Sequence, residues 1–497
     1  MPAMQVILWD TRKLDASKDF AGGYGVGQYH GHGGPRGWLI RRMYKRDYRP
    51  VSLNFAYLGA IFRKLGHEVA FVEDRTPPPA DLYVFNPSLI TLDIERKAIE
   101  QVRTRHPRAK VLVTGLVGYT LPEAFAGLGV TIVKGEAEQL LWKLDEVLEA
   151  NTPVASVGSV EDLDSLPWPD WSLFDHWKFR IGYDFSKFPT ALIQQSRGCT
   201  FSCNYCPYII VENTTRFRSP EHVVAEMNDD MKRYGFKSFK FRDPLFGLDR
   251  KRVLRLAELI GHLPRKIQFS IEGRIDLLRG ETLAALKDVG LTSITVGIET
   301  PDEQTLRQYK RSPINDDRQR EFVASCREMG IRTVAGFMIG FPEDTASDIR
   351  AVLRYAKAVN PTYANFNIVT PYPGTEFFAE VKDQIADFDF SKYTVYTPVL
   401  KYKNLTHDEV LALHAKCFTS YYFRWRYLQD NASLLWPGLR RFGVSGKPAS
   451  RPPSDTSHST PKRPHGLTIL QGHPELRKDG PHNRNQATRS DDPKSNA

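Results

Sequence analysis

Cysteine is scarce in this chain, with only five among 497 residues, and three of the five fall within one short segment. So few cysteines, so unevenly spread, argue against a disulfide framework and favour a reducing compartment, which we expect to be the cytoplasm. Long apolar runs are also missing, because none approaches the ~20 residues of a membrane-spanning helix. The N-terminus lacks a basic segment and reaches Asp10 early, so we expect neither a signal peptide nor a transmembrane segment.

The composition is that of an ordinary globular protein with a basic C-terminal segment. Hydrophobic residues make up 41% and charged residues 25% of the chain, which is ordinary for a soluble globular protein, and the length predicts two or three domains. Residues 445–497 carry nine Lys/Arg against five Asp/Glu, together with eight prolines, and are predicted to form a disordered basic tail. No basic stretch has the aromatic platform of a nucleic-acid-binding module, so we expect no nucleic-acid partner.

The three clustered cysteines, Cys199, Cys203 and Cys206, follow the spacing C-x3-C-x2-C directly after an apolar run. Three thiolates on one loop can hold three irons of a cubane cluster, whereas a closed site needs four ligands. The fourth iron would stay open, and an open metal position is where chemistry takes place. We therefore assign these cysteines as metal ligands and catalytic residues. The alternative is a zinc knuckle with His222, the nearest downstream histidine, although a second Cys-x-x-Cys pair is missing from the sequence.

Residues 1–150 are predicted to form a doubly wound parallel sheet, because apolar strand and helix patterns alternate after a glycine-rich loop that reaches Gly37. Ligands of such sheets bind at the carboxyl ends of the strands. Two of these ends carry candidate binding residues, namely Thr114 with Gly115 and Gly135 with Glu136. Strands are expected at 4–10, 67–73, 81–85, 110–115 and 130–136, and helices at 53–65, 93–106, 121–128 and 137–149.

The α/β pattern returns after a linker at 151–190 that is rich in proline, tryptophan and aspartate. Residues 191–400 contain six strand–helix repeats, which predict an incomplete (β/α)6 TIM-like barrel. The chemistry of such barrels lies at the carboxyl ends of the strands, where the three cysteines are expected to share one rim with Asp243, Arg274, Glu299 and Gly340. A helical segment at 401–444, with one long helix at 406–428, is expected to follow.

The cysteine motif, with Tyr205 just before its last cysteine, resembles the signature of the radical S-adenosylmethionine (radical SAM) enzymes. The strand segments 295–299 and 337–342 resemble two recurrent motifs of that family. The sheet ahead of the barrel resembles the cobalamin-binding class of the family, through the segments 57–60, 65–69, 111–115, 120–123 and 133–138. Gly115 is followed by leucine where this class usually has a second glycine, and the Asp-x-His-x-x-Gly motif of other cobalamin proteins is missing from the sequence.

The resemblance implies a [4Fe–4S] cluster, S-adenosylmethionine and cobalamin as cofactors. A bound S-adenosylmethionine presents an ammonium, a carboxylate, ribose hydroxyls and an adenine. Asp243 or Glu299 would accept from the ammonium or the ribose, Arg274 would pair with the carboxylate, and Gly340 would let the backbone approach the adenine. The predicted cofactor-binding residues are Tyr205, Asp243, Arg274, Glu299, Gly340, Thr114, Gly115, Gly135 and Glu136.

The activity that this resemblance implies is methylation of an unactivated carbon or a phosphorus in a small or lipophilic biosynthetic substrate. One S-adenosylmethionine supplies the methyl group and a second supplies the radical, with an electron donor such as flavodoxin or ferredoxin. Three alternatives stay open. The enzyme performs a cyclisation or rearrangement with the same cofactors, the protein is a non-catalytic cobalamin and iron–sulfur sensor, or the N-terminal sheet is a cofactor-free appendage.

Overall fold

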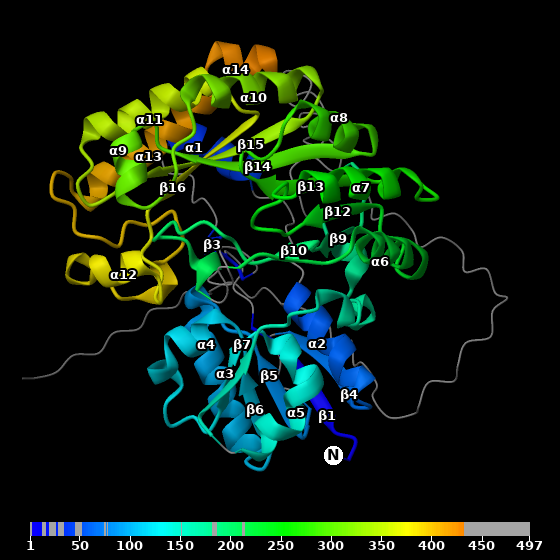
Figure 1. The fold of residues 1–497 in the computed structure, drawn as a ribbon. Coiled ribbons are helices and arrows are strands. Elements are labelled where there is room, and N and C mark those ends of the chain that lie inside the picture. The colour runs from blue at the N-terminus through cyan, green and yellow to red at the C-terminus, as the bar shows by residue number, and fades with distance from the viewer. Residues whose placement is uncertain are drawn as a thin grey trace, which may run out of the picture. The chain divides into compact units, whose positions relative to one another are not determined.

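Two six-stranded parallel sheets organise the chain (Figure 1). The computed structural model describes residues 2–11, 16–18, 26–27, 34–44, 52–73, 76, 78–150, 152–180, 186–210 and 214–431. These residues all belong to one unit, Met1–Pro437. The predicted tail at 445–497 and most of the predicted glycine-rich loop lie outside the described residues.

The first sheet has the strand order β4-β1-β5-β6-β7-β8, with every neighbouring pair parallel. From β1 the chain crosses to one side of the sheet to form β4. It then returns to the other side of β1 to form β5, β6, β7 and β8 in turn. This reversal creates a topological switch point between β1 and β5, and ligands of doubly wound sheets bind there. The predicted doubly wound fold is confirmed. Its strands are β1 (Gln5–Asp10), β4 (Glu68–Glu73), β5 (Leu82–Phe85), β6 (Lys110–Val113), β7 (Thr131–Gly135) and β8 (Val154–Gly158).

Alternate side chains of β1, β5, β6 and β7 pack into two different apolar clusters. Val6 and Leu8 of β1 pack into one cluster with residues of α2 and α5. Ile7 and Trp9 pack into another with residues of α3 and α4. Because strand residues alternate between faces, a near-continuous apolar strand buries both faces under helices. The helices are α2 (Leu53–Lys64), α3 (Leu92–Arg105), α4 (Leu116–Thr120) and α5 (Leu140–Glu149).

The second sheet has the order β16-β15-β14-β13-β12-β9, again with every pair parallel. Strands and helices alternate along the chain, and the helices lie along the outer side of the curved sheet (Figure 1). The predicted incomplete (β/α)6 barrel is confirmed. Its strands are β9 (Thr190–Ile193), β12 (Ser238–Phe241), β13 (Gln268–Gly273), β14 (Leu291–Glu299), β15 (Arg332–Ile339) and β16 (Tyr363–Ile368), and its main helices are α6 (Pro220–Arg233), α7 (Arg250–Gly261), α8 (Gly280–Asp288), α10 (Asp316–Glu328) and α11 (Ala346–Val359).

Strand β14 shows how the barrel separates its apolar layer from its inner face. Ile294, Val296 and Ile298 are buried in the apolar core. The alternate positions Gly297 and Glu299 are only half-buried and lie on the other face of the strand. Because side chains alternate along a strand, the second set faces the inside of the barrel, and Glu299 stands at its carboxyl rim.

Two helices differ from the sequence expectation. Helix α1 (Gly34–Tyr44) begins inside the predicted glycine-rich loop. Glycine disfavours helices, but Ile40 is buried in the core and tertiary packing outweighs that preference. The predicted helix at 121–128 is wrong, since α4 precedes it and only a 3-10 turn, Pro122–Phe125, follows before Gly127 takes a positive φ of 76°.

The boundaries of the linker and of the C-terminal helix also differ from the predicted ones. Strand β8 lies within the predicted linker at 151–190 and completes the first sheet by pairing with β7, and its pattern was weak because only Val157 is buried. The predicted helix at 406–428 is broken into α13 (His407–Tyr422) and α14 (Trp425–Asp430). Arg424, at the break, donates to the backbone oxygen of Lys357 at 2.8 Å. Among the described residues, no helix is both long and apolar enough to cross a bilayer.

Candidate active site

The cysteine motif occupies the loop of a small hairpin that the sequence did not predict. Strand β10 (Ser196–Arg197) pairs antiparallel with β11 (Arg216–Phe217), and all three cysteines lie between the two strands. The carboxylate of Asp243, just after β12, accepts from the backbone nitrogens of Gln195 (3.0 Å) and Ser196 (2.5 Å). It also accepts from Ser196 Oγ at 2.6 Å. Asp243 therefore fixes the start of the hairpin, and burial raises its pKa to about 7.

The three thiols lie close enough to influence one another electrostatically. Cys203 is buried, Cys199 and Cys206 are half-buried, and none forms a disulfide. Burial, together with smaller contributions from the neighbouring Cys203 and Cys199, raises the pKa of Cys206 to about 12. Three thiolates at such a place need a cation to compensate their charge. No three His, Cys, Asp or Glu side chains of the described ranges converge on a single ion. A cubane binds each thiolate to a different iron, so separate donors around one loop fit it.

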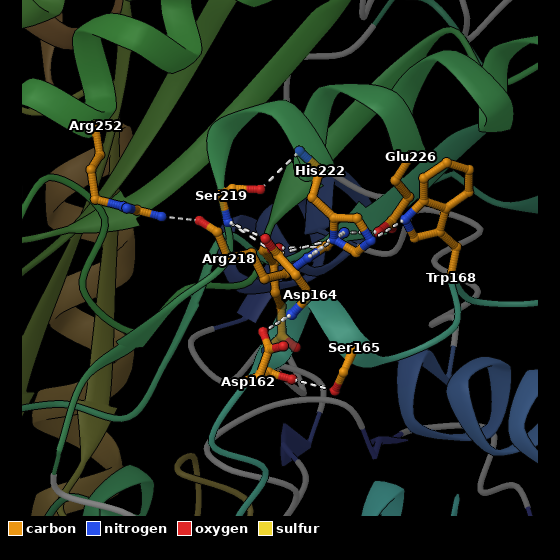
Figure 2. A network of polar contacts seen from close by, with 10 residues as sticks. Asp162, Asp164, Ser165, Trp168, Arg218, Ser219, His222, Glu226 and Arg252 are labelled. Carbon is orange, nitrogen blue, oxygen red and sulfur yellow. Dashed lines mark hydrogen bonds and ion pairs between the residues drawn. The ribbon is translucent and has the colours of Figure 1, made fainter.

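The histidine of the zinc alternative is engaged elsewhere. His222 Nε2 lies 2.9 Å from Trp168 Nε1, which donates to it, and Nδ1 lies 2.9 Å from Arg218 Nη2 and 3.2 Å from Asp164 Oδ1 (Figure 2). Burial and the Arg218 charge lower the pKa of His222. Both ring nitrogens therefore serve the contact between the linker and α6, and the cysteine loop gains no fourth ligand from this residue.

A buried arginine that sequence reasoning missed joins the cysteine loop to the barrel rim. Arg311 Nη1 lies 4.0 Å from Cys203 Sγ, and Nη2 donates to the backbone oxygen of Gly297 at 2.6 Å. The same guanidinium lies 3.3 Å from Glu299 Oε1. Glu299 has a positive φ of 70°, a conformation that is strained for a residue with a side chain and is common at functional sites. Burial raises the pKa of Glu299, while Arg311 and Arg274 oppose that rise.

Arg274 lies beside the cysteine loop, and its predicted pairing with the carboxylate of S-adenosylmethionine stays a prediction. Its guanidinium stacks over the ring of Phe201, in the cysteine loop, at 4.2 Å from the ring centroid. Nε and Nη2 donate to Asp276 at 3.0 and 3.1 Å. Nη1 is buried and has no hydrogen-bond partner among the described residues. A buried guanidinium nitrogen without an acceptor is costly, so this atom is suited to the carboxylate of a ligand beside the cluster loop.

Tyr205 and Gly340 lie at the same rim. The buried hydroxyl of Tyr205 has no hydrogen-bond partner among the described residues, and burial raises its pKa well above the ordinary value. Gly340 has a positive φ of 76°, and its backbone nitrogen donates to Asp344 Oδ2 at 2.8 Å. Their predicted contacts with S-adenosylmethionine stay predictions.

The predicted residues of the first sheet are largely explained by the protein's own packing. Thr114 Oγ donates to the backbone oxygen of Phe85 at 3.1 Å. Gly115 and Gly135 both have positive φ values, 82° and 119°. A Cβ on Gly135 would stand only 2.6 Å from the backbone oxygen of Gly158. These positions lie at the carboxyl ends of β6 and β7, and their contact with cobalamin stays a prediction.

Glu136, predicted to bind a cofactor, carries an ion pair with the cysteine hairpin. Its oxygens lie 2.8 and 3.0 Å from the Nη2 and Nη1 of Arg216, and 3.6 Å from Arg197 at the nearest. Arg197 Nη2 also lies 2.8 Å from Glu138 Oε1. In the sequence, these contacts are signalled only by the Arg-Gly pair just ahead of Cys199, and this pair does not indicate which residues the arginine contacts.

Comparison with known proteins agrees with this geometry. Residues 193–356 match the family model of the Radical SAM superfamily. An uncharacterized methyltransferase of Pyrococcus horikoshii is 27% identical over 268 residues, which cover 53% of this chain and 57% of that protein. The anaerobic magnesium-protoporphyrin IX monomethyl ester cyclase of Cereibacter sphaeroides is 29% identical over 304 residues, which cover 56% and 49%. The chain thus spans about half the length of these curated relatives.

A solved structure shares the fold over most of the chain. The cobalamin-dependent S-adenosylmethionine radical enzyme OxsB, with aqua-cobalamin bound, has a TM-score of 0.62 at 13% identity and covers 90% of this chain and 69% of its own. The match at residues 193–356 includes the cysteine hairpin and four of the six barrel strands in full. This chain therefore carries a radical SAM domain of the Radical SAM superfamily, whose cofactors are a [4Fe–4S] cluster and S-adenosylmethionine.

Proposed function

We propose that this protein is a cobalamin-dependent radical SAM methyltransferase that acts on an unactivated carbon, or on phosphorus, in a biosynthetic substrate. One observation carries the proposal. The stem of the cysteine hairpin is ion-paired to Glu136, at the carboxyl end of β7. A cluster loop and the ligand-binding edge of a doubly wound sheet therefore adjoin, as a transfer between two cofactors requires.

The radical SAM half of the site rests on five side chains. Cys199, Cys203 and Cys206 would hold the cluster, which when bound supplies the electron that cleaves the sulfonium of S-adenosylmethionine. Arg274 would orient that molecule by pairing its free Nη1 with the carboxylate. The ring of Phe201 holds this guanidinium over the cysteine loop. These residues bind and orient, which brings the reacting groups together before the chemistry begins.

Support for cobalamin comes from the first sheet. Its strand order creates a switch point between β1 and β5, and a fold of this kind with aqua-cobalamin bound matches 90% of the chain. The strand ends at Thr114, Gly115 and Gly135 would form the adjacent edge of the site. When bound there, cobalamin supplies a carrier for the methyl group. Asn86 packs against Gly115, since a Cβ on this glycine would stand 2.2 Å from its Oδ1, and so fixes the backbone at that edge.

The substrate and the electron donor belong to the same proposal. The half-buried inner face of the barrel suits a small or lipophilic biosynthetic molecule, and a flavodoxin or ferredoxin is the kind of protein that delivers single electrons to such a cluster. Five cysteines without a disulfide among them suit the reducing cytoplasm.

One relative favours a second candidate function. Because the matched magnesium-protoporphyrin relative is named a cyclase, a cyclisation that uses the same cofactors is the alternative. The two differ in whether the methyl group of S-adenosylmethionine is transferred. A cobalamin and iron–sulfur sensor would keep the cofactors and perform neither reaction.

The test is anaerobic reconstitution with cobalamin, a chemical reductant and methyl-labelled S-adenosylmethionine. Label recovered with the cobalamin supports the methyltransferase. Deoxyadenosine without label transfer would favour the cyclase, and neither product from a fully loaded protein would favour the sensor. The matched control is Cys326→Ala, because Cys326 is a buried core residue outside the motif and its loss is expected to change neither product.

A further inference from the structure

The cysteine loop is closed by two arginines that stand directly opposite each other. Arg197 of β10 and Arg216 of β11 are partners in the antiparallel register, and the three cysteines lie in the loop that this pair closes. Like charges opposite each other destabilise a strand pair. The side chains are only 12% and 9% exposed, so water screens them weakly. The hairpin therefore needs anions from elsewhere in the fold.

Two glutamates that follow β7 supply those anions. Glu136 binds Arg216 through both of its oxygens, at 2.8 and 3.0 Å, and Glu138 binds Arg197 at 2.8 Å. Their side chains are 10% and 7% exposed. The four groups carry two positive and two negative charges. We call Glu136, Glu138, Arg197 and Arg216 the stem clamp.

Close packing and a further hydrogen bond hold the backbone around the clamp. Gly135 has a φ of 119°, close to the backbone of Gly158, and this directs the next residue out of the sheet. The carboxylate of Glu136 also accepts from the backbone nitrogen of Val160 at 2.7 Å. On the other side, the guanidinium of Arg197 lies over the ring of Tyr57 from α2, 5.2 Å from its centroid. Burial raises the pKa of Tyr57 to about 12, so this wall of the clamp is neutral.

We propose that Glu136 and Glu138 are positioning residues for the cluster, acting through Arg216 and Arg197. They hold the stem of the cysteine loop against the first sheet, and they balance a positive charge that lies two residues from the cluster ligand Cys199. This inference deepens the proposed function, on which it rests. It also gives the carboxylate of Glu136 a role other than direct contact with cobalamin.

A charge near a cluster changes its reduction potential, because reduction adds a negative charge. Glu138→Gln leaves the Arg197 charge unbalanced and stabilises the reduced cluster, so the potential rises. Arg197→Gln leaves the Glu138 charge unbalanced, so the potential falls. A purely structural role would loosen the stem in both variants and move the potential in the same direction.

The experiment is a potentiometric titration of the reconstituted full-length protein, followed by electron paramagnetic resonance. We expect an upward shift for Glu138→Gln, a downward shift for Arg197→Gln, and a value near that of the unmodified protein for the double variant. Glu281→Gln is the matched control, because its partner Arg250 is on the surface and both side chains are more than 60% exposed. Its potential is expected to stay unchanged.

Variants that preserve the charge at each position separate an electrostatic effect from a loss of folding. Glu138→Asp and Arg197→Lys preserve both charges and are expected to keep the potential within the scatter of the control. Shifts of the same sign in the two Gln variants, or no shift in loaded protein, would overturn the inference and leave the proposed function standing. An unmodified protein that binds no cluster would instead overturn the proposed function.

Discussion

Removing the guanidinium of Arg311 tests the electrostatics of the rim most sharply. Its partner Glu299 is only 13% exposed and lies 3.3 Å away. The variant Arg311→Met keeps a similar volume but leaves that carboxylate without its nearest cation. Breaking a buried ion pair from one side costs about 3–5 kcal/mol, because the remaining charge stays desolvated. The backbone oxygen of Gly297 also loses the hydrogen bond that Arg311 donates.

The size of the effect should depend on pH. In the native protein, burial raises the pKa of Glu299 and Arg311 lowers it, with a net rise. Without Arg311 the pKa rises further. A group whose pKa is raised in the folded state favours folding at low pH, and this contribution is lost as the pH rises through the folded pKa. Because low pH favours the protonated form of Glu299, Arg311→Met is expected to be less destabilised at pH 5 than at pH 8.

The assay is thermal unfolding of the metal-free protein at both pH values. For a barrel of about 200 residues, 3–5 kcal/mol corresponds to a drop of roughly 6–20 °C in Tm at pH 8. The double variant Arg311→Met/Glu299→Gln removes both charges and should recover most of that loss. An unchanged Tm at pH 8, or a double variant no more stable than the single one, would refute this reasoning.

Three further predictions follow from single contacts. Cys203→Ala should lose its reconstituted iron while keeping the apo-protein Tm within a few degrees, as iron analysis and calorimetry will check. Gly135→Ala should lower the free energy of unfolding by about 1–3 kcal/mol, because the new Cβ is strained at this φ and clashes with a backbone oxygen. The control Gly66→Ala should cost about 1 kcal/mol, because φ is also positive there but the space is open. Equal losses of Tm in the two variants would contradict this prediction. The raised pKa of Asp243, about 7, means that its contribution to stability declines between about pH 4 and 7, so Asp243→Asn should show a shallower fall of Tm across that range.

The sequence was sufficient to predict the fold class of both sheets, although it missed the edge strand β8 of the first sheet. The predicted strands at 81–85 and 110–115 are short apolar runs between helices of clear 3.6-residue period, and this alternation permits few folds. The cysteine spacing was equally informative, because three thiols in eight positions on one loop restrict the chemistry severely. A serine followed by proline is typical of a helix start, and α6 begins this way, with Ser219 Oγ accepting from the backbone nitrogen of His222 at 3.2 Å.

The ion-pair partners of the site residues could not be predicted from the sequence. The hairpin β10–β11 has two residues in each strand, which is too short for a period to emerge. Arg311 lies between α9 (Glu303–Gln308) and α10, where nothing local distinguishes it from a surface arginine. The partners of Glu136 are 61 and 80 residues away along the chain, so only the folded sheet brings them together. Long-range ion pairs of this kind leave no local pattern to read.

A cluster with one open iron is central to the proposed chemistry, and one measurement tests for it directly. The anaerobically reconstituted protein is reduced, and its electron paramagnetic resonance spectrum is recorded with and without S-adenosylmethionine. We expect about four irons per chain and a cubane signal that changes when S-adenosylmethionine binds. Bound zinc, no metal at all, or a cluster signal that does not change when S-adenosylmethionine is added would contradict the presence of an open iron.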